Sequence, residues 1–370
     1  MGAVDVAVVL TGGFATRLRP LTLTRPKALL PILGRPLLDW IIEGLARAGV
    51  KKVILSVRYL ADLIRGRYGR GDSLGVELEY AEELKPLGDA GPIPVISRDY
   101  GLDNTFLVVY GDVFSDINYG DVLDFHRRVG GLATMVLTRV EDPSRYGVSV
   151  LDDGFRVVSF VEKPGRGEAM SNLVNAGVYV FEPEALKYFP PKTPSKLSRD
   201  VIPRMVREGV IYGYVHDGIW SDIGVPKDYM RANFNALDRY FPSGYVSREA
   251  EVGRGVELVN PVFIEGGVKV GEGSVVGPYA VIGRNARIGS SVRVSNSIIL
   301  ESVVIEGSTL IEGSIVGRGS YIGKWVRISS NSVLGDEVVL SSEVFIARNV
   351  IILPYKEVSN SVFSEGSVIL

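Results

Sequence analysis

Residues 6–27 read VAVVLTGGFATRLRPLTLTRPK, and this stretch decides both the fold and the kind of site that we expect. The apolar run Val6–Leu10 predicts a fully buried strand. Gly12 and Gly13 then open a turn in which backbone N–H groups can approach a ligand closely. Three arginines and a lysine follow in the same loop: Arg17, Arg19, Arg25 and Lys27. A buried strand that ends in a glycine-rich, cationic loop is typical of a phosphate site. The alternative is a surface loop with solvated charges, which the coincidence of strand, glycines and cations disfavours.

The chain as far as about residue 241 alternates short apolar runs with amphipathic stretches. This alternation predicts a parallel-dominated α/β sheet with helices on both faces. The expected strands are Val6–Leu10, Val53–Val57, Val76–Tyr80, Phe106–Tyr110, Ala133–Leu137, Val157–Val161 and Gly177–Phe181. The expected helices are Leu37–Ala48, Ala61–Tyr68, Asp121–Val129 and Lys227–Leu237. Ligands of such sheets bind beyond the carboxyl ends of the strands, where the Gly12 loop falls.

A carboxylate follows the expected strand Phe106–Tyr110, in the sequence Tyr110-Gly111-Asp112. Near a phosphate loop, such a group is the expected partner of Mg²⁺, which takes oxygen ligands and binds substrate phosphates as well. Asp is also favoured at helix N-caps, and the spacing alone leaves both interpretations of Asp112 open. For Asp116, four residues on, we favour capping.

Three further polar motifs lie at the ends or starts of expected elements. They are Val161-Glu-Lys-Pro164, Asn175-Ala-Gly177 and Ile219-Trp-Ser-Asp-Ile-Gly224. Each has a plain structural alternative: a solvated Glu–Lys ion pair, a turn and an Asp helix cap. None of them is strong alone.

A six-residue repeat begins at Val252, where glycine and β-branched residues replace the helical patterns. Every sixth residue is aliphatic: Val252, Leu258, Ile264, Val270, Val276, Ile282, Ile288, Val294 and Leu300. Near Ile298 the frame slips, and the aliphatic positions become Val304, Leu310, Val316, Ile322, Ile328, Leu334, Leu340, Ile346, Ile352 and Val358. A period of six marks a parallel β-helix of about six coils, each burying its neighbour's face. The slip predicts a loop, a corner adjustment or an altered coil near Ser295–Val303.

A short turn-rich stretch, Pro242-Ser243-Gly244, separates the two patterns. We therefore expect one domain over 1–241 and a β-helix over 242–370. The less regular end, Pro354–Leu370, is expected to cap the open end of the β-helix, which would otherwise expose strand edges.

Composition narrows the function classes. The chain has 370 residues, 46% of them hydrophobic, which suffices for two domains with sizeable cores. The net charge of −2 implies no broad basic surface, so we expect no nucleic-acid partner. No cysteine is present, which excludes disulfides, thiol nucleophiles and Cys-based zinc sites, and only His126 and His216 are available for imidazole chemistry. No signal segment or 18-residue apolar run is seen, so we expect a cytoplasmic protein without a membrane partner.

The motifs together resemble a known family. Gly12–Lys27 resembles the signature of sugar-1-phosphate nucleotidylyltransferases, roughly G-G-x-G-T-R-L-x-P-L-T followed by P-K. The later pieces match in order: Gly111-Asp112, Val161–Pro164, Asn175–Gly177 and Trp220–Gly224. An appended hexapeptide β-helix, left-handed in this family, matches as well. Two positions depart from the pattern: Ala15 replaces the usual third glycine, and Val225 replaces a common Thr. We expect the added methyl of Ala15 to change the local backbone conformation and to leave the site intact.

The resemblance implies a fold and a set of roles. The fold is α/β, a Rossmann-like nucleotidyltransferase domain with a mixed, mainly parallel sheet over 1–241, followed by a left-handed parallel β-helix over 242–370. The implied nucleotide-binding residues are Leu10, Gly12, Gly13, Arg17, Lys27, Gly88 and Asp112. Lys27 would neutralise charge at the reacting α-phosphate, and Asp112 and Asp222 would hold Mg²⁺. Lys163 would bind the sugar phosphate, and Glu162 and Asn175 the sugar hydroxyls. The stretch Glu82–Ala90 matches the family's base-binding segment, with Gly88 near the base; Arg17, Lys27, Asp112 and Asp222 are the implied catalytic residues.

The implied reaction suits this inventory. A sugar 1-phosphate has its second pKa near about 6, so at pH 7 its oxygen is mostly ionised and needs no general base. It attacks the α-phosphorus of a nucleoside triphosphate in line, and pyrophosphate leaves. Transfer of this kind depends mainly on positioning and charge stabilisation. A site of Arg, Lys, Asp and Mg²⁺ without His or Cys is therefore sufficient.

Alternatives remain open within and beyond this class. The segment Pro86–Pro92 and the signature are most similar to mannose-1-phosphate guanylyltransferases, with glucose-1-phosphate thymidylyl- or uridylyltransferases as the alternative; Asp89 stands where Thr is common in the guanylyl group. A catalytically silent regulatory subunit is a second hypothesis, although such relatives usually lose a lysine or metal carboxylate that this chain keeps. Acyl transfer by the β-helix commonly uses a His base, and none lies beyond His216, so we expect no acetyltransferase activity. The flat faces of the β-helix predict assembly into a homo-oligomer.

Overall fold

The computed structural model describes residues 4–165, 167–191 and 194–370. The chain divides into two compact units that do not follow chain order. The first unit contains residues 1–13 and 37–220, and the second contains 14–36 and 221–370. The second unit therefore joins most of the signature loop to the β-helix. The division by chain order at residues 241 and 242 stays a prediction.

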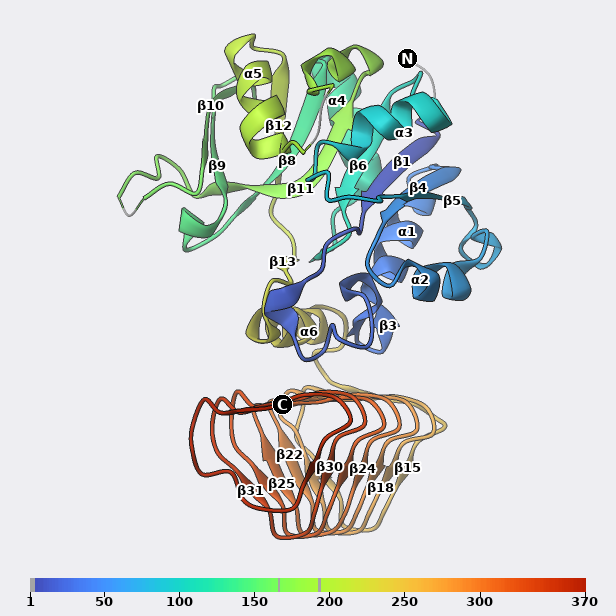
Figure 1. Cartoon of the computed structure of the whole chain (residues 1–370), viewed down its shortest axis with the longest axis vertical. Helices are drawn as coiled ribbons and strands as arrows, with labels where there is room; N and C mark the ends of the chain where they lie inside the picture. The colour runs from blue at the N-terminus through green and yellow to red at the C-terminus, as the bar shows by residue number, and fades with distance from the viewer. Residues whose placement is uncertain (1–3, 166, 192–193) are drawn as a thin grey trace. The chain divides into compact units, whose positions relative to one another are not determined.

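A mixed sheet, nine-stranded in its described part, forms the core of the first unit (Figure 1). Its main path runs β10-β9-β11-β6-β1-β4-β5, and β8 pairs with both β11 and β12. The strands are β1 (Val6–Leu10), β4 (Lys52–Val57), β5 (Glu77–Glu82), β6 (Phe106–Tyr110), β8 (Ala133–Arg139), β9 (Gly147–Leu151), β10 (Val157–Glu162), β11 (Leu173–Phe181) and β12 (Ile211–His216). The neighbours β6, β1, β4 and β5 are all parallel, whereas β11 runs antiparallel to β6 and β8. Each predicted strand is present, and the predicted fold class is confirmed.

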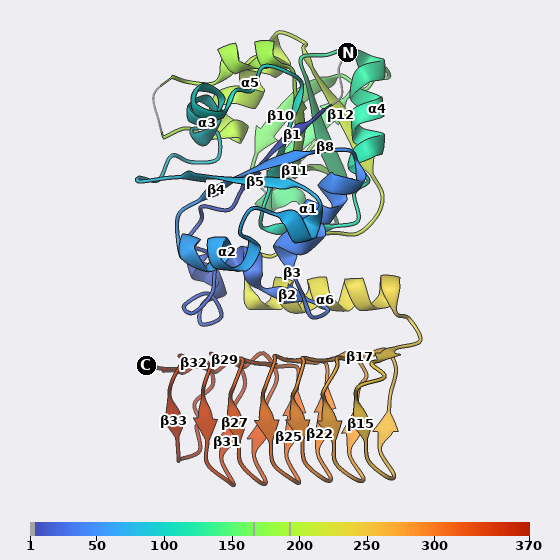
Figure 2. The ribbon, with the colours of Figure 1, turned by 90° about the vertical axis from the view of Figure 1, so that its right-hand side faces the viewer.

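Helices cover both faces of this sheet, since α3 and α5 lie on one side and α4 on the other (Figure 2). The helices are α1 (Leu37–Arg47), α2 (Ala61–Tyr68), α3 (Pro92–Tyr100), α4 (Tyr119–Val129) and α5 (Ile202–Arg207). Shorter elements are η3 (Asp72–Leu74), β7 (Val113–Ser115), η4 (Pro143–Arg145), η5 (Pro183–Tyr188) and η6 (Leu197–Val201). The predicted helices of this unit are confirmed within two residues, but α3 and α5 were missed. The first turn of α3 contains Pro92 and Pro94, which hide the helical pattern although Pro is tolerated at a helix start.

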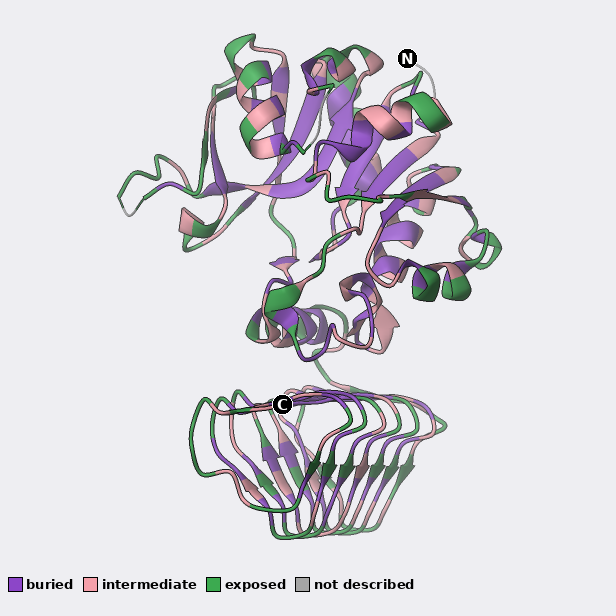
Figure 3. Ribbon diagram, viewed as in Figure 1, coloured by how far each residue is buried: buried purple, intermediate pink, exposed green. Residues whose placement is uncertain are grey.

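The strands carry the core, as the purple band through the sheet in Figure 3 shows. Val8, Val108 and Phe106 are fully buried, and Ile93 of α3 and Met205 of α5 pack in the same cluster. Burial of the parallel strands on both faces explains why they appear in the sequence as continuous apolar runs. The rigid sheet thereby fixes the positions of the loops that follow its strands.

The second unit begins with the loop that carries the signature cations. Its elements before the β-helix are η1 (Thr16–Leu18), η2 (Lys27–Leu29), β2 (Pro31–Ile32), β3 (Arg35–Pro36), β13 (Trp220–Asp222, whose first residue belongs to the first unit) and α6 (Pro226–Tyr240). Helix α6 holds the loop directly: the Tyr229 hydroxyl donates to the Pro31 carbonyl at 2.6 Å, and the Leu33 N–H donates to Asn233 Oδ1 at 3.0 Å. These contacts explain why α6, which follows the sheet in sequence, packs with residues 14–36.

Three parallel sheets form the sides of the β-helix, and its coils stack side by side (Figure 2). The first sheet contains β14 (Tyr245–Val246), β17 (Val262–Ile264), β20 (Ala280–Ile282), β23 (Ser297–Ile299), β26 (Ile315–Val316), β29 (Val333–Leu334), β32 (Ile351–Ile352) and β34 (Val368–Ile369). The second contains β15 (Glu251–Val252), β18 (Lys269–Val270), β21 (Arg287–Ile288), β24 (Val304–Ile305), β27 (Tyr321–Ile322), β30 (Val339–Leu340) and β33 (Glu357–Val358). The third contains β16 (Glu257–Leu258), β19 (Val275–Val276), β22 (Arg293–Ser295), β25 (Leu310–Glu312), β28 (Arg327–Ile328) and β31 (Phe345–Ile346). The aliphatic ladder forms one continuous core, and the predicted left-handed parallel β-helix is confirmed.

The corner adjustment predicted near Ser295–Val303 is confirmed at Asn296, but a second adjusted corner, at Gly313, was missed. Two corners, rather than one, turn with one residue fewer than the others: inward Val294 is followed by inward Ile299, and inward Ile311 by inward Val316. Asn296 and Gly313 take the left-handed backbone conformation in these corners, at φ 48° and 57°. The strict six-residue repeat therefore assigned Val304 and Leu310 to the inward positions, which was wrong because both are only half-buried. Ile305 and Ile311 point inward instead.

No helix among the described residues is both long enough and apolar enough to cross a membrane.

Candidate active site

Gly12 and Gly13 lie directly after β1, at the carboxyl edge of the parallel strands. A Cβ on Gly12 would lie 2.6 Å from Glu83 Oε1, so a larger residue there would displace this carboxylate. A Cβ on Gly13 would meet nothing within 4 Å. Leu10, the last residue of β1, is aligned with Tyr110, the last residue of β6. The predicted nucleotide-binding residues of this segment thus lie at the strand ends, where a phosphate loop is expected.

Ala15 takes the left-handed backbone conformation, with φ 46° and ψ 44°. Glycine adopts this region readily, and other residues adopt it at a cost of about 1 kcal/mol. The Ala15 carbonyl accepts hydrogen bonds from the Thr22 hydroxyl at 2.9 Å and from the Leu18 N–H at 3.0 Å. The loop therefore keeps a glycine-like turn at the position where the family signature has glycine.

Asp112 lies beside the start of this loop. The preceding Gly111 donates its N–H to the Leu10 carbonyl at 2.9 Å, and a Cβ on Gly111 would lie 2.5 Å from Thr11 Cγ2. Asp112 precedes the strand β7 and caps no helix, so the capping interpretation is wrong for it. The strand order, with β6 directly beside β1, brings the carboxylate motif to the phosphate loop.

Asp116 was expected to cap α4, and this prediction is wrong. Asn118 is the N-cap, and its Oδ1 accepts the Gly120 N–H at 3.0 Å. Asp116 Oδ1 instead lies 3.0 Å from His216 Nε2 at the end of β12. The competing partner is distant in the sequence, which is why a local capping preference gave the wrong answer.

The Asn175-Ala-Gly motif forms an irregularity inside β11, where the register with β8 shifts between Asn175 and Tyr179. Asn175 Oδ1 accepts the Gly177 N–H at 3.0 Å, and its amide donates to the Tyr179 hydroxyl. Gly177 has φ 77°, and a Cβ there would lie 2.7 Å from the ring of Tyr110. The motif is thus more than a turn, because it packs against the strand end that leads to Asp112.

Glu162 ends β10 and Lys163 follows it, and both are exposed. Lys163 has a left-handed backbone, with φ 49°, and donates its N–H to the Tyr146 carbonyl at 2.9 Å. The Tyr146 ring packs edge-on against Trp220 at 5.2 Å, and Trp220 Nε1 donates to the Ala176 carbonyl at 3.0 Å. Tyr146 and Trp220 together therefore link three of the sequence motifs, a role of Tyr146 that its sequence neighbourhood does not indicate.

Gly88, in the segment expected to bind the base, is fixed by a backbone contact. Its φ is 77°, and a Cβ would lie 2.1 Å from the Ser195 carbonyl oxygen. The same carbonyl accepts the Ala90 N–H at 3.1 Å, and the Ser195 N–H donates to Leu87 at 3.0 Å. At the other end of the segment, Glu83 accepts from the Ser56 hydroxyl and, at 3.3 Å, from the Leu87 N–H.

Asp89 has a positioning role that the sequence did not suggest. Its Oδ2 accepts the Tyr110 hydroxyl at 2.7 Å, and its Oδ1 accepts the Leu197 N–H at 2.7 Å. Burial raises the pKa of Tyr110, so this hydroxyl stays a proton donor. Asp89 thus joins the base segment to the strand end before Asp112, which gives a structural reason for Asp where Thr is common.

The second unit holds the other predicted residues. Lys27 Nζ lies 3.8 Å from Asp222 Oδ1, and both side chains are mostly shielded from solvent, at 11% and 23% exposure. A Cβ on Gly224 would lie 3.4 Å from Asp222 Oδ2 and 3.6 Å from Arg17 Nη2. Arg17 and Lys27 of the first motif therefore both lie near Asp222 of the last motif. The N-cap of α6 is Val225, so the capping interpretation of Asp222 is wrong.

Asp228 is a neighbour that the sequence analysis missed. It lies in the first turn of α6, buried, and pairs with Arg231 at 2.9 Å. Its Oδ2 would lie 3.7 Å from a Cβ on Gly224, beside the Arg17 guanidinium. The sequence offered one signal for Asp228, an acidic residue in the first turn of the helix that follows the Trp220–Gly224 motif. An acid at this position is equally common where it only stabilises the helix dipole.

The donor set suits a metal that is shared with phosphate. Within residues 4–165, 167–191 and 194–370, no group of three or more His, Cys, Asp or Glu side chains could hold a metal by itself. Mg²⁺ is commonly bound through one or two carboxylates together with substrate phosphates and water. Asp112 of the first unit and Asp222 of the second each carry a carboxylate of the kind that binds Mg²⁺ in this way.

The border between the units falls inside the first motif, between Gly13 and Phe14, and inside the last, between Trp220 and Ser221. A glycine-rich loop that follows a buried strand of a Rossmann-like sheet, in a chain with an appended β-helix, is typical of a nucleotide-dependent transferase. The sequence profile of the nucleotidyl transferase family matches residues 6–239, and that of the GMPPB C-terminal domain matches 258–369. The chain belongs to the nucleotidyl transferase family, and the resemblance drawn from its motifs is confirmed.

Individual relatives agree with this assignment. A Sulfolobus acidocaldarius protein is 43% identical over 267 residues, which are 72% of each chain. The mannose-1-phosphate guanylyltransferase catalytic subunit beta of Danio rerio is 41% identical over 228 residues, 60% of this chain and 62% of the relative. Among solved structures, HddC from Yersinia pseudotuberculosis complexed with GMP-PN has a TM-score of 0.53 and 28% identity, and the match covers 63% of this chain and 99% of HddC.

Proposed function

We propose that this enzyme joins mannose 1-phosphate to GTP, giving GDP-mannose and pyrophosphate. Two observations support guanosine and mannose: the Danio rerio relative is named for that reaction, and the C-terminal third matches a domain named for the same subunit. The observation that carries the transferase activity is the shielded Lys27–Asp222 pair, which joins the first and last motifs. A silent subunit would have little reason to keep this pair together with Asp112.

The reaction balances without an acid or base from the protein. An ionised oxygen of the sugar phosphate forms a bond to the α-phosphorus of GTP, the bond from that phosphorus to the β-phosphate oxygen breaks, and pyrophosphate carries away the electron pair. Lys27 and Arg17 offset charge on the phosphates, which is where charge builds up during the transfer. Gly12 and Gly13 present backbone N–H groups to the nucleotide phosphates.

The remaining motif residues orient the second substrate. We assign Lys163 to the sugar phosphate, and Glu162 and Asn175 to the sugar hydroxyls, as the family resemblance implies. The backbone of Lys163 is held by Tyr146, and the amide of Asn175 is held by Tyr179. Both side chains are therefore attached to positions that the sheet keeps rigid, which suits in-line attack.

Mg²⁺ is the proposed cofactor, with Asp112 and Asp222 as its carboxylates. The ion, when bound, neutralises phosphate charge and aligns the triphosphate. The chain's own contribution is to keep the Asp222 carboxylate within 3.8 Å of the Lys27 ammonium group.

A substrate panel tests the proposal. Pyrophosphate release is measured with GTP, ATP, UTP, CTP and dTTP, each with mannose 1-phosphate and glucose 1-phosphate. GTP with mannose 1-phosphate is expected to be the best pair. A preference for dTTP or UTP with glucose 1-phosphate would support the thymidylyl- or uridylyltransferase alternative. Absence of turnover with every pair would support a silent subunit.

We also propose that the β-helix joins two copies of the chain. The outward side of its second sheet carries an apolar stripe, Val304, Tyr321 and Val339, and the last two are 41% and 37% exposed. Arg287 lies on one side of the stripe and Glu357 on the other. If two copies pack antiparallel with Tyr321 on the two-fold axis, Val304 meets Val339 and Arg287 meets Glu357, so the face is complementary to itself.

Molar mass in solution tests this assembly. The wild type is expected to be a homo-oligomer, and Tyr321→Glu is expected to shift it toward the monomer. Val275→Glu, on the outward side of the neighbouring sheet, is the matched control and should leave the mass unchanged. A monomeric wild type at micromolar concentration would contradict the proposal.

A further inference from the structure

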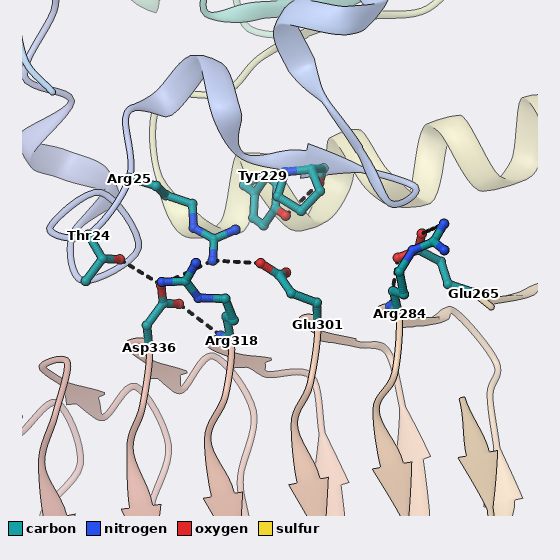
Figure 4. A network of polar contacts seen from close by, with 9 residues as sticks. Thr24, Arg25, Tyr229, Glu265, Arg284, Glu301, Arg318 and Asp336 are labelled. Carbon is teal, nitrogen blue, oxygen red and sulfur yellow. Dashed lines mark hydrogen bonds and ion pairs between the residues drawn. The ribbon is translucent and has the colours of Figure 1, made fainter. Parts of the chain in front are cut away.

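The loop that carries Lys27 is anchored on the β-helix by a network of charges with two buried members, Arg25 and Asp336 (Figure 4). Arg25, two residues before Lys27, has a side chain only 11% exposed. Its Nη2 lies 3.1 Å from Asp336 Oδ2 and 3.1 Å from Glu301 Oε1. Both carboxylates project from coils of the β-helix, far from Arg25 in the sequence.

Asp336 is the centre of this network, with a side chain 1% exposed. From the loop, the Thr24 hydroxyl donates to its Oδ2 at 2.8 Å. From the β-helix, the Arg318 N–H donates to its Oδ1 at 2.9 Å, and Arg318 Nη2 lies 3.6 Å from Oδ2. A buried carboxylate with several donors is held in one geometry, and removal of a partner leaves charge uncompensated.

The far end of the same loop also contacts the β-helix. Gly34 has φ 73°, and a Cβ there would lie 2.4 Å from the carboxylate of Glu265. Burial raises the pKa of Glu265, whose Oε2 accepts the Arg284 N–H at 2.9 Å. The loop thus lies against the β-helix at both ends, while Tyr229 and Asn233 of α6 bind Pro31 and Leu33.

The path from the network to Lys27 is short and stiff. Pro26 separates Arg25 from Lys27, and its ring restricts φ to the observed −67°. Lys27 then begins the short helix η2, with Ala28 buried behind it. A shift of the Arg25 backbone is therefore transmitted to the Lys27 backbone, whose ammonium group lies 3.8 Å from Asp222.

We propose that Asp336 and Glu301 are positioning residues for nucleotidyl transfer, acting through Arg25 on Lys27. The β-helix then contributes to catalysis within its own chain, in addition to any role in assembly. This inference rests on the proposed role of Lys27 at the α-phosphate. Misplacement of a charged group by about 1 Å can cost about 100-fold in rate.

Kinetics of the full chain test the inference with Asp336→Asn, Arg25→Gln and the double variant. Each single variant is expected to lower kcat about 10- to 100-fold, with the KM for the nucleotide changed less than about threefold, because the lysine acts mainly in the transition state. If Asp336 acts through Arg25, the double variant loses no more than the worse single variant. Unchanged kcat in the single variants, or additive losses in the double variant, would overturn the inference.

Two further measurements separate positioning from general destabilisation. Val338→Ala, in the core of the coil that carries Asp336, should destabilise the β-helix but leave kcat unchanged at a temperature where it is folded. In a Lys27→Met background, Arg25→Gln should lower the residual kcat less than about twofold, whereas a similar loss in both backgrounds would contradict action through Lys27. All assays use the substrate pair on which the wild type is most active, so a different substrate preference would revise the proposed function without affecting this test.

Discussion

Lys27 Nζ lies 3.8 Å from Asp222 Oδ1, although the two residues belong to the first and the last of the sequence motifs. Their side chains are shielded from solvent, so the attraction between them is weakened less by water and salt than at the surface. The pair joins a phosphate-binding cation to a metal-binding carboxylate of the proposed reaction. Its disruption should therefore affect the chemical step.

Lys27→Met is expected to lower kcat by about 100- to 1,000-fold, because the charge that stabilises the developing phosphate charge is lost. The measurement is pyrophosphate release at saturating substrates. Lys51→Met removes an exposed lysine, paired with Asp5 at 3.5 Å, and should leave kcat unchanged. Near-wild-type kcat in Lys27→Met would remove this lysine from the catalytic step.

Gly88→Ala is expected to reduce the free energy of unfolding by about 3 kcal/mol and to raise the KM for the nucleotide. The new Cβ would lie 2.1 Å from the Ser195 carbonyl oxygen, which belongs to the backbone and cannot move aside cheaply. Gly130→Ala is the matched control: it has a similar φ of 64° and open space, so it should cost only about 1 kcal/mol. Equal losses in urea unfolding would mean that the Ser195 contact is unimportant.

Ala15→Gly should leave kcat and KM within about twofold of the wild type, since Ala15 already has the conformation that glycine adopts. Release of backbone strain is expected to offset the extra freedom of glycine in the unfolded chain, so stability should change by less than about 1 kcal/mol. Steady-state kinetics and urea unfolding check both statements. A tenfold change in KM would show that the methyl group itself affects the phosphate loop.

Because His126 is buried, we expect the protein to lose stability in mildly acidic solution. His126 Nδ1 lies 2.8 Å from the Thr134 hydroxyl, and burial lowers the pKa of His126 below the usual 6.5 even though Glu182 lies 3.2 Å away. Its neutral form supports the fold fully above pH 6.5, and this stability is lost as pH falls through the lowered folded-state pKa. The wild type should therefore lose more unfolding free energy between pH 7.5 and pH 5 than His126→Gln. An equal loss in both proteins would exclude His126 as a cause.

Much of the fold could be predicted because the signals are local. The continuous apolar runs of β1 and β6 mark strands buried on both faces, and the six-residue period marks the β-helix. The prolines at the start of α3 hid a helix, and the two shortened corners at Asn296 and Gly313 appeared as a single slip. The backbone can shorten a corner without breaking the aliphatic ladder, so the period alone did not reveal the second shortened corner.

The order of the motifs predicts candidate site residues, but it does not predict their structural partners. Capping was favoured for Asp116 and remained open for Asp112 and Asp222, because Asp is common at helix starts. The partners His216 and Lys27 are distant in sequence, so no local pattern reveals them. The same holds for Arg25 with Asp336, which only the folded chain brings together.

The most direct test of the central claim is an internal competition. The wild-type protein is incubated with equal concentrations of GTP, ATP, UTP, CTP and dTTP and of mannose 1-phosphate and glucose 1-phosphate, and the nucleotide sugars formed early are quantified by mass spectrometry. Because the competing substrates are at equal concentration, the ratios of these early products equal the ratios of the kcat/KM values. The account predicts that GDP-mannose predominates, whereas predominance of a thymidine or uridine diphosphate glucose, or the absence of any nucleotide sugar, would contradict it.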